Sequence, residues 1–171
     1  NPIIVAAIRD KLGKPSGEFT KADLEKVTRL YLDSNQLTSV KGLEKLNQLT
    51  WLSLKCKQLT DVTVLEKLTR LRELDLSSSR LTNAPKGLEK LTQLKRLNLG
   101  ANKLTDIKGL EKLTKLESLG LSQTQLTKLP EGLEKLTKLK VLYLRYNPDL
   151  AKDQIDELQK ALPKCKIYHN A

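Results

Sequence analysis

The stretch LKRLNLGANKLTDIKGLEKLTK at positions 94–115 sets the pattern of the whole chain. Its first half has leucines at 94, 97 and 99, and its second half has leucines at 110 and 113. Alternating leucines predict a short strand with one buried face, whereas apolar residues three apart predict a single 3₁₀ or α turn. The stretch is therefore expected to form a strand, a turn and a short helical return.

Variants of this unit fill most of the chain. The sequence LEKL recurs at 43, 65, 88, 110 and 133, and GLEKLTKL occurs letter for letter at 109–116 and 132–139. The units of 22 or 23 residues are 27–48, 49–70, 71–93, 94–115 and 116–138, with a sixth opening at 139. A unit this small buries too little apolar surface to offset the entropy of ordering its backbone. Stability is therefore expected to come from contacts between stacked repeats.

The motif L-x-x-L-x-L-x-x-N-x-L, found from Leu94 to Leu104, resembles the leucine-rich repeat family. The 22-residue period with LTDIKGLEKLTKL is similar to the internalin-like bacterial branch of that family. The resemblance implies an α/β solenoid, a right-handed horseshoe with a parallel sheet on its concave side. It also implies a bacterial protein that is secreted or attached to the cell surface. The near identity of the units fits either recent duplication or a consensus design.

An open solenoid would expose leucines at both ends, so caps are expected. Ile4 and Ile8 share one helical face, and Thr20 with Asp23 forms the pattern of a helix start. At the other end, 152–161 predicts a helix that stops before Pro163, followed by a strand at CKIYH. The prediction is one domain over 1–171, with a helical N-terminal cap at 1–26, repeats at 27–147 and a helix-strand C-terminal cap at 148–171.

The sequence contains few residues of the types that catalytic sites use. The chain has one histidine and two cysteines that lie 109 positions apart, with no metal, nucleotide or protease motif. We therefore expect no enzymatic activity, no cofactor and no metal, although Glu73 and Asp75 could form an acid pair on one strand. No apolar run approaches the roughly 18 residues that cross a bilayer, so no membrane insertion is expected.

Three asparagines occupy the family's asparagine position at the end of the strand. Asn35, Asn102 and Asn147 are predicted to be structural, because a short amide can bond backbone groups where the chain leaves the sheet. In the second unit this position is Lys57, preceded by Cys56. That departure leaves two readings open, a neutral drift or a used site with a reactive or intermolecular Cys56 thiol. Cys165 is expected to be a core residue.

The strand positions between the leucines vary while the rest of each unit is nearly copied, and this contrast separates scaffold from recognition surface. Tyr31 and Trp51 are the preferred anchor pair, and Tyr143 near Tyr146 provides aromatic rings at the other end. The predicted binding residues are Arg29, Tyr31, Asp33, Trp51, Lys55, Glu73, Asp75, Arg96, Asn98, Tyr143 and Arg145.

We predict a monomeric, non-catalytic module that binds a protein or peptide ligand on its concave face. The alternative is a basic structural or surface protein whose convex side adheres to an anionic polymer or the cell envelope, because the net charge is +11. Specific nucleic-acid binding is not expected, since the basic residues are dispersed and are not interleaved with aromatic ones.

Overall fold

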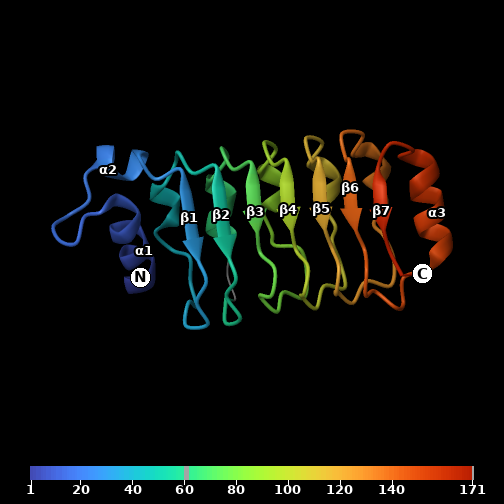
Figure 1. Cartoon of the computed structure of the whole chain (residues 1–171), viewed down its shortest axis with the longest axis horizontal. Coiled ribbons are helices and arrows are strands. Elements are labelled where there is room, and N and C mark those ends of the chain that lie inside the picture. Colours follow the sequence, from blue (N-terminus) through green and yellow to red (C-terminus); the bar gives the residue numbers. More distant parts are fainter. Residues whose placement is uncertain (60–61, 171) are drawn as a thin grey trace.

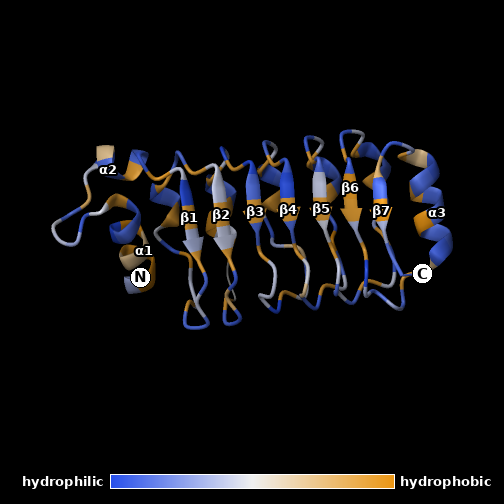
Figure 2. Ribbon diagram, viewed as in Figure 1, coloured by the Kyte–Doolittle hydropathy of each residue, from blue (hydrophilic) through white to orange (hydrophobic). Residues whose placement is uncertain are grey.

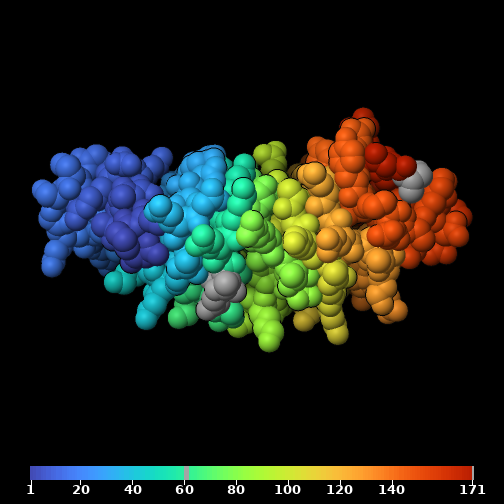
Figure 3. Space-filling model, turned by 90° about the horizontal axis from the view of Figure 1, so that it is seen from below, coloured from blue at the N-terminus to red at the C-terminus, as the bar shows by residue number. Residues whose placement is uncertain are grey.

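The structure, a computed structural model, describes residues 1–59 and 62–170. It does not describe Thr60, Asp61 and Ala171. The predicted second unit and C-terminal cap include these positions, which lie outside the described residues. Successive coils follow one another along the long axis without crossing, from the N-terminal cap to the C-terminal cap (Figures 1 and 3).

Seven parallel strands form one open sheet in chain order. Leu30, Leu52 and Leu74 lie in register on neighbouring strands, and the same register continues to the last strand. The strands are β1 (Arg29–Leu32), β2 (Trp51–Leu54), β3 (Glu73–Asp75), β4 (Arg96–Asn98), β5 (Ser118–Gly120), β6 (Val141–Tyr143) and β7 (Lys166–Tyr168). The predicted leucine-rich repeat solenoid with a parallel sheet is confirmed.

Short 3₁₀ helices return the chain behind the sheet (Figure 1). They are η1 (Leu43–Lys45), η2 (Thr63–Lys67), η3 (Leu88–Lys90), η4 (Leu110–Lys112) and η5 (Leu133–Lys135). Four of them follow a glycine whose φ lies between 85° and 108°, a left-handed conformation that costs other residues energy. This backbone requirement explains the glycine of the repeated GLEK sequence.

The core is one continuous cluster that runs from Ile4 to Cys165. The central leucine of each strand from β1 to β6 is at most 3% exposed. Figure 2 shows hydrophobic residues recurring at similar heights in neighbouring coils. Each leucine therefore covers those of the adjacent repeats, as expected from the periodicity.

Helices cover both ends of the stack (Figure 1). The helix α1 (Pro2–Leu12) buries Ile4 and Ile8, and α2 (Lys21–Glu25) begins with a capping box formed by Thr20 and Asp23. The helix α3 (Lys152–Ala161) buries Ile155 and Leu158 and leads into β7. The predicted helical N-terminal cap and helix-strand C-terminal cap are confirmed.

A ladder of buried polar residues closes the bends after the strands. The amide oxygen of Asn102 accepts hydrogen bonds from the backbone N–H groups of Ser79 and Leu81, both at 3.0 Å. Its amide nitrogen donates to the carbonyl oxygens of Leu76 and Leu99 at 2.9 and 2.8 Å. One side chain thus satisfies backbone groups of two repeats. The bend ladder consists of Ser79, Asn102, Thr124 and Asn147, all buried.

The first two repeats build the bend differently, and the predicted structural role of Asn35 is wrong. Asn35 and Lys57 are exposed. In the second repeat the buried residue is Cys56, one position earlier, whose thiol donates to the carbonyl of Leu32 at 3.3 Å. Its backbone N–H donates to the hydroxyl of Ser79 at 3.2 Å.

The physical cause of the shift is the backbone path. In the later repeats the residue before the ladder position is left-handed, with φ of 57° at Ser78, 53° at Ala101, 60° at Gln123 and 61° at Tyr146. Neither Ser34 nor Cys56 has a positive φ. Burial also disfavours the reactive reading of Cys56, because the residue is 0% exposed and burial raises the pKa of its thiol.

Candidate binding surface

The side chains that project from the sheet away from the core form a surface, here called the sheet face. Strand register aligns them in two rows, one starting at Arg29 and one at Tyr31. The first row is Arg29, Trp51, Glu73, Arg96, Ser118, Val141 and Lys166. The second row is Tyr31, Ser53, Asp75, Asn98, Gly120, Tyr143 and Tyr168. Parallel pairing in register therefore brings residues 22 to 25 positions apart side by side.

Aromatic rings gather at the N-terminal end of the sheet face. The rings of Tyr31 and Trp51 stack with centroids 6.4 Å apart and an interplanar angle of 13°. The guanidinium carbon of Arg29 lies 4.9 Å from the Trp51 ring centroid. The Tyr31 hydroxyl donates to the carboxylate of Asp33 at 2.8 Å, which raises the pKa of Tyr31. These contacts hold an aromatic platform on which Tyr31 stays 54% exposed.

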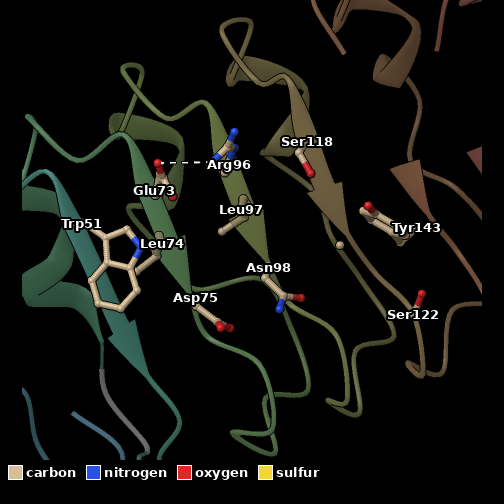
Figure 4. Close-up of a pocket in the computed structure, with 11 residues that line it drawn as sticks. Trp51, Glu73, Leu74, Asp75, Arg96, Leu97, Asn98, Ser118, Ser122 and Tyr143 are labelled. Carbon is tan, nitrogen blue, oxygen red and sulfur yellow. Dashed lines mark ion pairs between the residues drawn. The ribbon is translucent and has the colours of Figure 1, made fainter. Parts of the chain in front are cut away.

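A shallow groove of about 400 Å³ occupies the middle of the sheet face, between Trp51 and Tyr143 (Figure 4). The two rings are four strand spacings apart, roughly 19 Å. Gly120 keeps the floor low, because a Cβ atom there would lie 2.6 Å from the side-chain oxygen of Asn98. That oxygen is held in place by the backbone N–H of Gly100 at 3.1 Å. The groove therefore depends on the absence of a side chain at one position.

Charges in the groove are paired across neighbouring strands. Arg96 lies 3.5 Å from the Glu73 carboxylate, and Lys55 lies 3.7 Å from that of Asp75. The Asp75 carboxylate also accepts the backbone N–H of Ser77 at 2.9 Å. Glu73 and Asp75, the two acids that could form a catalytic pair, thus each have their own cationic partner. Because these side chains are partly exposed, the ion pairs are weak and can be exchanged for contacts with a ligand.

A second aromatic cluster closes the other end of the groove, and part of it was missed from the sequence. Tyr143 stacks on Tyr168 with centroids 5.3 Å apart and an interplanar angle of 8°. Arg145 and Lys166 lie 5.4 and 4.9 Å from the Tyr168 centroid. Tyr146 was the expected neighbour, but it lies in the left-handed bend after β6. The alternation of CKIYH was the signal that could have placed Tyr168 on the sheet face.

Two serines beside this surface are buried. Ser53 is 1% exposed and Ser77 is 9% exposed. Within the described residues, the Ser53 hydroxyl has no hydrogen-bond partner. The face between Tyr31 and Asp75 is therefore closed at this point, so the open surface consists of the two aromatic ends and the groove.

The described ranges contain no group of three or more His, Cys, Asp or Glu side chains placed to hold a metal ion. Within the same ranges, no helix is both long and apolar enough to cross a bilayer.

The repeated strands, returns and bend asparagines can be compared with known proteins. The leucine-rich repeat profile matches residues 69–126, and a profile of two leucine-rich repeat copies matches 114–160. The chain belongs to the leucine-rich repeat family. A search of curated proteins gives no match.

Solved structures similar to this leucine-rich repeat protein include internalins. InlF of Listeria monocytogenes is 26% identical, with a TM-score of 0.75 over 96% of this chain and 54% of the InlF chain. A leucine-rich repeat protein of Leptospira interrogans is 32% identical, with a TM-score of 0.74 over 91% of this chain and 41% of its own. Internalin C2 of L. monocytogenes, 24% identical, shares the fold with a TM-score of 0.76 over 98% of this chain and 82% of its own. The chain therefore spans about half or less of the first and second of these proteins.

Proposed function

We propose that this chain is a non-catalytic module that binds a protein or peptide on its sheet face. Leucine-rich repeat domains generally mediate protein interactions, and the likeness to InlF supports a bacterial surface or secreted setting. We further propose that the chain acts as a monomer and that residues 1–171 form a single domain.

The observation that carries the proposal is the pair of aromatic clusters at the two ends of the groove. Stacked tyrosine and tryptophan rings with an arginine over each cluster are the residue types that dominate binding energy at protein interfaces. The groove between the two clusters adds exposed ion pairs that set the charge complementarity to a ligand. Its low floor leaves room for an extended peptide segment. Trp51 and Tyr31 remain the preferred anchors, with Lys55, Glu73, Asp75 and Arg96 tuning the charge.

The test is affinity capture from an extract of the source organism with immobilised chain. Trp51→Ala and Tyr143→Ala are each expected to reduce the captured protein roughly tenfold or more, as loss of an interface anchor does. Tyr146→Ala is the matched control, because it removes an exposed ring outside the sheet face. Circular dichroism checks that every variant is folded.

Capture that is unchanged in both anchor variants would contradict the proposal. Capture of polyanions that ignores the aromatic substitutions and is abolished by high salt would favour the anionic-polymer alternative instead.

A further inference from the structure

The net charge of +11 is unevenly placed on the solenoid. Each of the five 3₁₀ returns carries one glutamate followed by one lysine, so the returns contribute no net charge. Lys90 binds Glu66 of the preceding return at 2.7 Å, while the Glu44 and Glu111 carboxylates accept the N–H groups of Gly42 and Gly109. The returns are therefore locally neutralised, and the surplus lies elsewhere.

Much of the surplus lies where each return passes into the next strand, the upper edge in Figure 1, here called the strand-start edge. Its charged residues are Arg70, Arg72, Lys95, Lys115, Lys138, Lys140 and one acid, Glu117. Six cations and one carboxylate give this edge a net charge of +5, nearly half of the total. All six cations are exposed.

The edge side chains form rows along the long axis of the solenoid. Lys115 donates to the side chain of Gln93 in the preceding repeat at 2.7 Å, and Arg70 donates to Gln48 in the same manner. In the adjacent row, Glu117 lies 3.4 Å from Lys95 and 2.7 Å from Lys140. Each repeat advances by one strand spacing of roughly 4.8 Å, so Lys115 and Lys138 are neighbours in the first row, and Arg72 and Lys95 are neighbours in the second. Gln93 and Glu117 interrupt the two rows.

We propose that the strand-start edge binds a linear acidic polysaccharide, whose sulfate or carboxylate groups follow the rows of cations. Six exposed cations spread over two adjacent rows along the solenoid suit a polymer with repeated anions, because each added contact releases counterions. This binding is independent of the sheet face and of the protein partner proposed for it.

Other anionic partners fit the edge less well. Its charged rows contain no aromatic residue on which nucleic-acid bases could stack. The exposed large hydrophobic residues of the described chain are Val5, Tyr31, Tyr143 and Tyr146, none of which lies on this edge. The edge therefore lacks both the apolar centre of a protein interface and the apolar side chains that anchor a protein in a membrane surface.

Glu117 limits the affinity of this edge. Its carboxylate contacts two of the cations in its row, and the ion pair with Lys140 lowers the pKa of Glu117. Glu117→Gln removes the repulsion toward a polyanion and frees Lys95 and Lys140. Binding is therefore expected to strengthen when this one side chain is neutralised.

Heparin, a sulfated polysaccharide, is the probe, titrated into the whole chain by calorimetry at about 0.1 M salt. Gln substitution of Arg72, Lys95, Lys138 and Lys140 together is expected to weaken binding roughly tenfold or more. The matched control removes the same charge from the returns by Gln substitution of Lys45, Lys67, Lys112 and Lys135, with a loss of less than about threefold. Glu117→Gln should tighten binding, and Trp51→Ala should leave it unchanged.

Equal losses in the edge variant and the return variant would overturn the proposal, because net charge alone would then explain binding. An unchanged affinity in Glu117→Gln would do the same. Tighter binding of single-stranded DNA or of phosphatidylserine vesicles than of heparin at equal salt would reject a polysaccharide as the partner.

Discussion

At the scale of the residue, one side chain per bend decides how a coil closes. Asn102 and Asn35 occupy equivalent sequence positions, but only Asn102 is buried and bonded to backbone groups. In each later bend a left-handed residue, such as Ala101, turns the next side chain inward, whereas the first two bends have no left-handed residue at this position. The same residue type therefore has different roles at the two positions, because the conformation of the preceding backbone differs.

This difference predicts that two alanine substitutions lower the free energy of unfolding by unequal amounts. Asn102→Ala leaves several buried backbone groups without partners and is expected to lower the free energy of unfolding by about 3 kcal/mol. Asn35→Ala is the matched control and should change it by less than about 0.5 kcal/mol. Urea unfolding of both variants measures the difference, and equal costs would contradict the assignment of the bend ladder.

The two thiols should be unreactive in the folded protein. Cys56 is 0% exposed and Cys165 is 3% exposed, and burial raises the pKa of each thiol. Reaction with a thiol reagent at about pH 8 is expected to be negligible for native protein and complete for both cysteines in denaturant. Rapid modification of one thiol in the native state would show that its coil opens.

At the scale of the element, the caps depend on short-range sequence signals that the structure realises. The five-residue helix α2 is too short to be stable alone and begins with a reciprocal capping box. Asp23 also binds Lys14 at 2.8 Å, which ties the loop after α1 to this helix. The N-terminal cap therefore contains an electrostatic contact that acid can remove.

The hydrogen bond from Lys14 keeps the pKa of Asp23 well below its usual range. A carboxylate with a lowered folded-state pKa contributes stability that is fully present above its unfolded pKa of about 4 and decreases as pH falls below it. Asp23→Asn should therefore lower the melting temperature by a constant amount above about pH 5, and this difference should shrink toward about pH 2. Thermal melts of both proteins across this range test the effect, and a pH-independent difference would argue against it.

At the scale of the whole molecule, the seven strands of the described residues share one core, and a helix covers each end of the stack. Stability is thus distributed over the interfaces between coils. The change of bend geometry between the second and third repeats is a break in this regularity.

The proposed single domain predicts a single unfolding transition despite that break. Trp51, the only tryptophan, reports on the second repeat by fluorescence, whereas far-ultraviolet circular dichroism reports on the whole chain. The two denaturation curves are expected to coincide. An earlier fluorescence transition would show that the first two repeats unfold as a separate unit.

The sequence by itself determined the solenoid, its parallel sheet, both caps and the variable positions of the sheet face. These follow from leucine periodicity and capping patterns, which are local and repeat along the chain. Only the tertiary structure decided the inward turn of Cys56, the exposure of Asn35, the burial of Ser53 and the stacking of Tyr143 on Tyr168. It also placed nearly half of the net positive charge along one edge. These features depend on backbone dihedral angles and on contacts between coils more than 20 residues apart, which no single repeat encodes.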